Sequence, residues 1–125
     1  MRKNPTPSEL AILDVLWNLG PATVREVHEK LNPGKSTGYT TTLKLLQIMA
    51  EKNLVRRDET QKAHVYKARI PREQAQSQLV SDLMDKLFGG SASGLVMHAL
   101  SSKRASAAER AEIRKLLDEM ERESR

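Results

Sequence analysis

Two helix signals joined by a short turn, within residues 23–53, constrain this chain more than any other feature. Thr23 is followed three positions later by Glu26, which is the reciprocal pattern of a capping box and predicts a short helix. The next residues, PGKS, are a turn signal, and a second helix is expected from about Thr37 to Lys52. Two short helices joined by so short a turn are typical of a helix-turn-helix motif.

The second predicted helix has two halves of different character. Its later half carries an apolar stripe at spacings of three and four residues, formed by Leu43, Leu46, Met49 and Ala50. Its first half, STGYTTT, consists of residues that form helices less readily than alanine. One interpretation of this half involves no ligand: Ser36 or Thr37 caps the helix, and the threonines are solvated.

Contact with a DNA groove is the interpretation that we favour for this first half. The second helix of a helix-turn-helix motif enters the major groove, and its N-terminal residues meet base edges. Hydroxyl and ammonium groups on one side of such a helix bond to bases and phosphates. The candidates share one face, away from the apolar stripe, at offsets of 0, 3, 4 and 7: Thr37, Thr40, Thr41 and Lys44, with Tyr39 as a donor to phosphate.

A first helix and a hairpin are expected on either side of this motif. The segment SELAILDVLWNLG predicts a helix with Ser8 as its N-cap, a stop at Gly20-Pro21, and a buried stripe of Leu10, Leu13, Leu16 and Trp17. The segment LVRRDETQKAHVYKARI alternates and is rich in Val and Tyr, which predicts strands of about 54–57 and 63–69. Three helices and a hairpin predict a winged helix-turn-helix domain over residues 1–70.

Basic side chains are expected to contact phosphates around this domain. The tip of the hairpin, where a wing would lie along the DNA backbone, is surrounded by Arg56, Arg57, Lys62 and Lys67. An ordinary solvated turn remains the alternative, because Asp58 and Glu59 dilute the charge. Arg25 and Lys35, near the two ends of the short helix that follows Thr23, are further expected phosphate contacts.

The net charge of the chain is unevenly placed. Residues 1–70 hold 12 Lys or Arg and 7 Asp or Glu, an excess of five positive charges, whereas residues 71–125 hold 9 of each. The whole formal charge of +5 therefore belongs to the N-terminal part, which favours a polyanionic partner for that part.

The C-terminal part, residues 71–125, is expected to be a helical dimerisation domain. Pro71 opens a long helix that ends at Gly89-Gly90, and two shorter helices follow, the last with Ser106 as its N-cap and Glu109 completing a capping box. Their apolar seams are narrow, as in coiled coils, and have little domain to pack on, so a second copy of the chain is the expected partner. The expected dimer contacts are Leu79, Leu83, Leu87, Leu95, Leu116 and Leu117.

The residue types needed for catalysis or metal binding are missing or scattered. The chain has no cysteine, no glycine-rich phosphate loop after a strand, and no plausible serine, histidine and aspartate constellation. His28, His64 and His98 share no ligand spacing, and His28 is expected at the edge of the buried face of its helix. We therefore expect no enzyme, no metal and no cofactor. The sequence has neither the apolar run of a signal peptide nor an apolar stretch long enough to span a membrane, so a cytoplasmic protein is expected.

Two long segments, PTPSELAILDVLWNLGPATVREVHEKLN and GYTTTLKLLQIMAEKNLVRRDETQKAHVYKA, closely resemble the penicillinase and methicillin-resistance repressors, the BlaI/MecI/CopY family. The similarity covers residues 5 to about 98 well and the tail weakly, and YTTTLKLL is among its most specific pieces. The resemblance implies a winged-helix homodimer that binds inverted-repeat operators and blocks transcription. It also implies a recognition helix with Thr37, Tyr39, Thr40, Thr41 and Lys44, and a wing with Arg56, Arg57 and Lys62.

Two departures from the family pattern bear on release from DNA. Copper-responsive members carry a C-terminal cysteine cluster, and a chain without cysteine excludes copper sensing by that route. In β-lactam-responsive members, a membrane sensor protease triggers cleavage at an Asn-Phe bond of the dimerisation domain, and the nearest counterpart here is His98-Ala99. A sensor protease therefore stays open as a partner, together with the inducing signal, the operator and the regulated genes.

These observations together predict a mainly α protein with a small β-hairpin: a winged helix-turn-helix domain followed by a helical dimerisation domain. The predicted function is that of a homodimeric, DNA-binding transcriptional repressor whose partner is an inverted repeat in double-stranded DNA. The alternative is a winged-helix protein-interaction module without an operator of its own.

Overall fold

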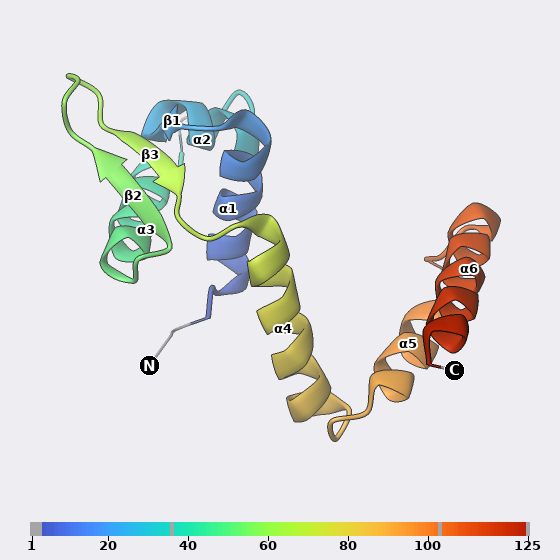
Figure 1. Cartoon of the computed structure of the whole chain (residues 1–125). Helices are drawn as coiled ribbons and strands as arrows, with labels where there is room; N and C mark the ends of the chain where they lie inside the picture. The colour runs from blue at the N-terminus through green and yellow to red at the C-terminus, as the bar shows by residue number, and fades with distance from the viewer. Residues whose placement is uncertain (1–3, 36, 103, 125) are drawn as a thin grey trace. The chain divides into compact units, whose positions relative to one another are not determined.

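A computed structural model describes residues 4–35, 37–102 and 104–124 of the chain (Figure 1). The chain divides into two compact units, residues 1–79 (the N-terminal unit) and residues 80–125 (the C-terminal unit). The elements follow the order of a winged helix-turn-helix and then further helices, which confirms the predicted fold class. In chain order they are α1 (Pro7–Leu19), β1 (Ala22–Thr23), α2 (Val24–Leu31), α3 (Tyr39–Glu51), β2 (Val55–Asp58), β3 (Val65–Ala68), α4 (Arg72–Leu87), α5 (Ala92–Ser101) and α6 (Ala107–Glu123).

The wing is a three-stranded antiparallel sheet in which β3 lies between β1 and β2. Tyr66 of β3 is opposite Ala22 of β1 and Arg57 of β2. The sequence predicted only the hairpin, because β1 has two residues and so shows no alternation. Thr23 ends β1 and also caps α2 through the predicted box with Glu26, so the start of α2 is tied to the wing.

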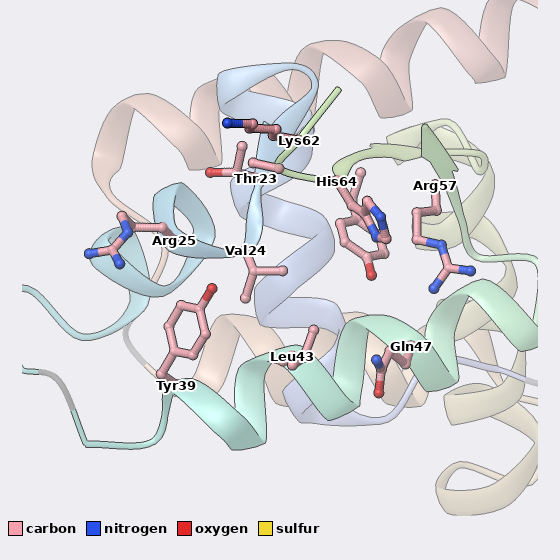
Figure 2. A pocket seen from close by; sticks show the side chains of 11 residues that line it. Thr23, Val24, Arg25, Tyr39, Leu43, Gln47, Arg57, Lys62 and His64 are labelled. Carbon is pink, nitrogen blue, oxygen red and sulfur yellow. The ribbon is translucent and has the colours of Figure 1, made fainter. Parts of the chain in front are cut away.

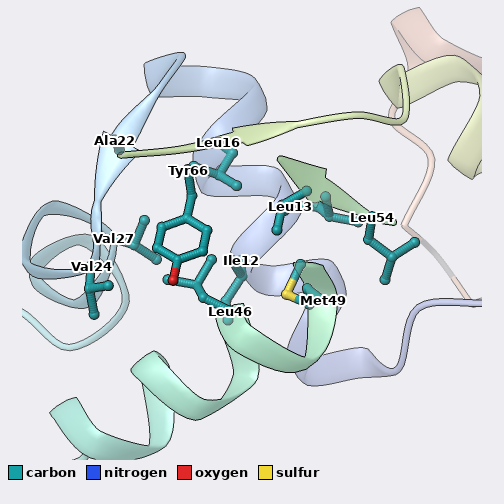
Figure 3. Packing of buried hydrophobic residues seen from close by; sticks show 11 residues of the cluster. Ile12, Leu13, Leu16, Ala22, Val24, Val27, Leu46, Met49, Leu54 and Tyr66 are labelled. Atoms are coloured by element: carbon teal, nitrogen blue, oxygen red, sulfur yellow. The ribbon is translucent and has the colours of Figure 1, made fainter. Parts of the chain in front are cut away.

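The core of the N-terminal unit lies between α1, α2, α3 and the sheet (Figure 3). The ring of Tyr66 is buried among aliphatic side chains from the three helices, including Ile12, Val27 and Leu46. Leu54 and Met49 extend this cluster toward the end of α3. Burying such side chains stabilises a fold by about 1.5–3 kcal/mol each, so the unit has a core of its own.

Helix α1 begins differently from the prediction. Its N-cap is Thr6, not Ser8: Thr6 Oγ1 accepts from the backbone N–H of Glu9 at 3.2 Å, and Glu9 Oε1 accepts from the N–H of Thr6 at 2.9 Å. Three residues after Ser8 stands Ala11, which has no group to return such a bond. The buried face also differs, since Ile12 is fully buried with Leu13 and Leu16, whereas Leu10 and Trp17 are half-buried.

Helix α3 begins at Tyr39, two residues later than predicted. Gly38 precedes it with φ 88°, a left-handed conformation that glycine adopts without strain and that interrupts the helix. Thr37 therefore lies before the helix and does not share its periodicity. Ser36, the other proposed cap, lies outside the described residues. At the other end, Asn53 has φ 64°, which suits its expected role as the stop.

A buried ion pair joins the start of α1 to the end of α3. Lys52 Nζ, after α3, lies 2.8 Å from Glu9 Oε1 and 3.0 Å from Glu9 Oε2 at the start of α1. The Glu9 side chain is only 2% exposed. Burial alone would raise the pKa of Glu9, but hydrogen bonds from Lys52 and the Thr6 backbone hold its pKa below the ordinary value. The carboxylate therefore stays charged and holds α1 against the end of α3.

The C-terminal unit has no closed core: none of its described residues is fully buried. Ser106 and Glu109 form the predicted capping box, so the N-terminus of α6 is capped by local side chains. Yet large apolar side chains remain exposed on each helix: Val80, Leu83, Leu87, Val96, Met97, Leu116, Leu117 and Met120. Of the expected dimer contacts, Leu95 is half-buried here, as is Leu79 in the N-terminal unit. Among the described residues, no helix combines the length and apolar character that crossing a membrane needs.

Candidate nucleic-acid interface

The outward side of α3 carries a row of polar side chains. Thr42, Leu46 and Met49 of this helix are buried against the core. Thr40, Lys44 and Gln47, at spacings of four and three residues, are exposed on the opposite side, and we call them the outer face of α3. A hydroxyl, an ammonium and an amide in one row offer donors and acceptors of the kinds that recognise base edges.

A hollow of about 480 Å³ lies beside this face, between α3, the start of α2 and the wing (Figure 2). Helix α3 contributes Tyr39, Leu43 and Gln47 to its wall, and α2 contributes Arg25. The wing contributes Arg57, Lys62 and His64. Three cationic side chains thus border one hollow, and no carboxylate is among its described lining residues. The charge of this hollow suits an anion such as the DNA backbone.

The outer side of the wing is also basic. Arg56 of β2 and Lys67 of β3 are directly opposite each other in the sheet, and both are exposed. Like charges in a directly opposed pair destabilise a sheet, so this pair favours an anionic partner that offsets the repulsion. It borders a second hollow, of about 500 Å³, together with Pro21, Val65 and the wing tip.

The acidic residues of the wing tip are engaged locally. Asp58 accepts hydrogen bonds from the Thr60 backbone N–H at 2.9 Å and from its hydroxyl at 2.7 Å. These bonds hold the pKa of Asp58 below its ordinary value. Glu59 pairs with Arg57 at 2.7 Å, an exposed contact that adds little stability. The tip is therefore a shaped turn in which one arginine already has a carboxylate partner, which weakens the positive field of the wing.

The N-terminus of α3 has no side-chain cap. In α1, α2, α5 and α6 a threonine or serine side chain accepts a hydrogen bond from the first turn. At α3 the N-cap residue is Gly38, which has no side chain to offer. The first-turn N–H groups of a helix without such a cap favour an anion.

The predicted site residues do not form a single cluster. Arg25, Tyr39, Arg57 and Lys62 come together around the hollow of Figure 2, whereas Thr40 and Lys44 belong to the adjacent outer face. Thr37 and Thr41 are exposed but border a different hollow, near the starts of α1 and α3. Lys35 is exposed in the turn before α3, and Arg56 lies on the outer side of the wing.

Two residues with suitable chemistry escaped the sequence interpretation, Gln47 and His64. Gln47 is exposed three residues after Lys44 and also lines the hollow. Extending the offsets beyond Lys44 by one helical step would have found it. His64 lines the hollow only because the hairpin folds back over α3. No local sequence pattern predicts this position of His64.

Comparison with known proteins identifies relatives along nearly the whole chain. Residues 5–119 match the family model described as penicillinase repressor. A transcriptional regulator BlaI of Mycobacterium tuberculosis is 34% identical over 115 residues, which cover 90% of this chain and 82% of that protein. A penicillinase repressor of Staphylococcus aureus is 18% identical over 113 residues, 90% of each chain. A MarR family protein from Bacillus stearothermophilus has a TM-score of 0.49 and 18% identity, and the match covers 95% of this chain and 74% of that one.

The family match and the relative in Mycobacterium tuberculosis decide between the broad classes of function. They confirm the resemblance inferred from the sequence, since the family model spans both units of the chain. The matched family consists of transcriptional repressors, so the expectation of a DNA-binding regulator rather than an enzyme is confirmed as well.

Proposed function

This chain belongs to the penicillinase repressor family, and from that premise we propose that it is a homodimeric repressor that binds inverted repeats in double-stranded DNA. The observation that carries the proposal is the meeting of α3, the start of α2 and the wing around one cationic hollow.

The outer face of α3 is proposed to enter the major groove. Lys44 and Gln47 are long enough to reach base edges, lysine as a donor to guanine and glutamine as a bidentate partner of adenine. Thr40, nearer the start of the helix, offers a hydroxyl and also a methyl for contact with thymine. Thr41, at the side of this face, is proposed to contact the adjoining backbone, as is Thr37 before the helix.

The side chains around the outer face are proposed to hold the DNA backbone. Arg25, Tyr39 and Lys62 line the hollow beside α3, so phosphates of the strand that passes between α3 and the wing would lie against them. The uncapped start of α3 and the exposed Lys35 suit a phosphate next to the turn. Arg56 and Arg57 extend the contact along the wing. Such contacts set register and orientation and carry no base information.

The C-terminal unit is proposed to join two copies of the chain. Its exposed apolar side chains, Leu83, Leu87, Leu116 and Leu117 among them, would be covered by the same unit of the partner. A two-fold dimer presents two copies of α3 to successive turns of the major groove, which explains an inverted repeat as the target. Because the proposed target is chromosomal DNA, we propose a cytoplasmic location.

If a sensor protease released the protein from DNA, it would cleave the C-terminal unit. The His98-Ala99 bond lies within α5, and both residues are exposed. Proteases cut extended chain, so cleavage at this bond requires α5 to unwind first.

Selection of bound fragments from genomic DNA tests the proposal. The full chain is incubated with sheared DNA, and the retained fragments are sequenced. We expect enrichment of an inverted repeat whose half-sites lie about one helical turn apart or a multiple of it. Binding to it should weaken steeply as salt rises, because neutralised phosphates release counterions. A protein-interaction module would enrich no such repeat, and that result would reject the proposal.

A further inference from the structure

His28 is a buried polar side chain that joins three segments around the start of α3. It belongs to α2 and is only 3% exposed. Its Nδ1 lies 3.0 Å from Oγ1 of Thr42 in α3, and its Nε2 lies 2.8 Å from the backbone carbonyl oxygen of Lys35 in the turn. One ring therefore contacts the residues that enter α3 and the first buried residue within it.

The chemistry of these contacts fixes part of the proton arrangement. A backbone carbonyl only accepts hydrogen bonds, so Nε2 of His28 carries a proton and donates it to Lys35. The Thr42 hydroxyl lies near Nδ1 and also 3.2 Å from the carbonyl oxygen of Gly38. The imidazole, the threonine hydroxyl and two turn carbonyls thus form one connected group.

The same ring also packs against the first residue of α3. The rings of His28 and Tyr39 meet edge to face, with centroids 5.7 Å apart and an interplanar angle of 74°. Gly38 provides no capping side chain, and neither ring nitrogen of His28 accepts from a first-turn N–H. These contacts with α2 therefore tether the start of α3 without capping it.

We propose that His28 is the positioning residue for the outer face of α3: it holds the first turn of that helix in place and so sets the discrimination between DNA sequences. This inference rests on the proposed DNA-binding function and assigns His28 no contact with DNA itself. Base contacts from a short side chain such as Thr40 tolerate little displacement of the helix. Phosphate contacts from long side chains such as Arg25 and Lys62 tolerate much more. A loosened first turn should therefore lower sequence-specific affinity while non-specific affinity stays unchanged.

Three substitutions of His28 separate its contacts. Phenylalanine keeps an aromatic ring and removes both hydrogen bonds, whereas asparagine places an amide near the Nδ1 position and glutamine near the Nε2 position. We expect His28→Phe to lower the ratio of specific to non-specific affinity about tenfold, since net hydrogen bonds and unsatisfied partners have energies of this order. His28→Asn and His28→Gln each retain one contact, so each should lower this ratio by only about threefold.

Thr42 provides a matched pair of variants that leaves the histidine in place. Thr42→Val keeps the shape and removes the hydroxyl, whereas Thr42→Ser keeps the hydroxyl. We expect Thr42→Val to lower the specificity ratio and Thr42→Ser to leave it unchanged. Melting of each variant, followed through Trp17 fluorescence, identifies the temperature at which all are folded, and binding is compared there.

Amide exchange tests the positioning role without DNA. The N–H of Thr42 donates to the Gly38 carbonyl at 3.0 Å, the first backbone hydrogen bond of α3. We expect this amide to exchange about tenfold faster in His28→Phe, while amides near Met49 keep their wild-type rates. Acceleration along all of α3 would indicate general destabilisation and would overturn the positioning role.

The outcomes distinguish this inference from the proposed function. If the wild-type chain selects no DNA sequence, the proposed function fails, and the inference fails with it. If the wild type selects an inverted repeat that His28→Phe discriminates equally well, only the positioning role is overturned. A lower specificity ratio, unchanged non-specific binding and faster Thr42 exchange together support it.

Discussion

The two units of this chain complete their apolar surfaces in different ways. The N-terminal unit closes a core around Tyr66, Ile12 and Leu46 within one copy of the chain. The C-terminal unit has well-formed helices, but its described residues include none that is fully buried, and Leu87 is 71% exposed. Capping and helix propensity therefore do not distinguish the units. The difference lies in where each apolar face finds its partner, which in our proposal is the same chain for one unit and a second copy for the other.

Leu83→Glu should produce the largest effect that this comparison predicts. The charge would enter the proposed contact between copies, so we expect monomers in sedimentation experiments and operator affinity lower by on the order of a thousandfold, because the second half-site no longer contributes. The N-terminal unit should melt as before, which Trp17, the only tryptophan, reports. Leu117→Glu should behave alike. Intact dimers of both variants would reject the assigned seam.

Lys52→Met should affect the N-terminal unit alone. It leaves the Glu9 carboxylate buried without its ammonium partner, so we expect the free energy of unfolding to fall by about 2–3 kcal/mol, less than for a fully buried pair because Lys52 is partly exposed. Urea unfolding followed by Trp17 fluorescence measures it. Unchanged urea stability would mean that the ion pair does not hold the start of α1 to the end of α3.

The same carboxylate predicts a pH dependence. Because the pKa of Glu9 is lowered in the folded chain, its stabilisation is complete above the unfolded-state value of about 4.3 and is lost as the pH falls through the folded-state pKa. Glu9→Gln should remove this part of the acid sensitivity. Glu109→Gln in the C-terminal unit is the matched control, a capping-box carboxylate with a lowered pKa but no ammonium partner described. An acid sensitivity of Trp17 fluorescence that follows Glu109 instead would contradict this assignment.

Gln47→Ala should weaken binding to the selected DNA site about tenfold while leaving folding and dimerisation intact, because it removes one base contact from each copy. Lys44→Ala should do the same. Competition with site variants mutated at single base pairs provides the measurement. Glu51→Ala, one turn farther along α3 on an exposed position, is the control and should bind at least as tightly as wild type. Wild-type affinity for both Gln47→Ala and Lys44→Ala would show that another face of α3 meets the DNA.

Lys67→Ala should have the smallest effect, equal for specific and non-specific DNA. Each phosphate that a protein neutralises adds about 0.9 to the slope of log affinity against log salt, so the slope should fall by about 0.9 for each phosphate that Lys67 neutralises. Lys86→Ala, in the C-terminal unit, should leave the slope unchanged. If both lysines changed the slope equally, the positive charge of the N-terminal unit would not be what holds the backbone.

Local signals in the sequence predicted much of this fold. The capping boxes at Thr23 and Ser106 involve residues three positions apart, so their partners are visible in the sequence. The helical stripe of α3 and the alternation of the hairpin are equally local. At α1, however, we expected Ser8 as the N-cap, although Thr6 and Glu9 have the same capping-box spacing of three residues.

The features that escaped prediction depend on the three-dimensional arrangement. β1 exists only because β3 folds back beside Ala22 and Thr23. The late start of α3 follows from the left-handed backbone of Gly38, a positive-φ conformation that every glycine of the chain except Gly94 also adopts. His28 was expected near the edge of a buried face, but its contacts with Lys35 and Thr42 arise only when the turn closes. His64 likewise reaches the hollow only through the fold of the hairpin, whereas the helical spacing beyond Lys44 would have identified Gln47.

The number of chains bound to one DNA fragment tests whether the C-terminal unit joins two copies on one inverted repeat. The selected fragment, carrying a single inverted repeat, is mixed with the full chain, and the mass of the complex is measured in solution. We predict two chains per fragment at every protein concentration at which a complex forms, with Leu83→Glu giving stepwise occupancy by single chains. One wild-type chain per fragment at saturation would contradict the division of tasks between the two units.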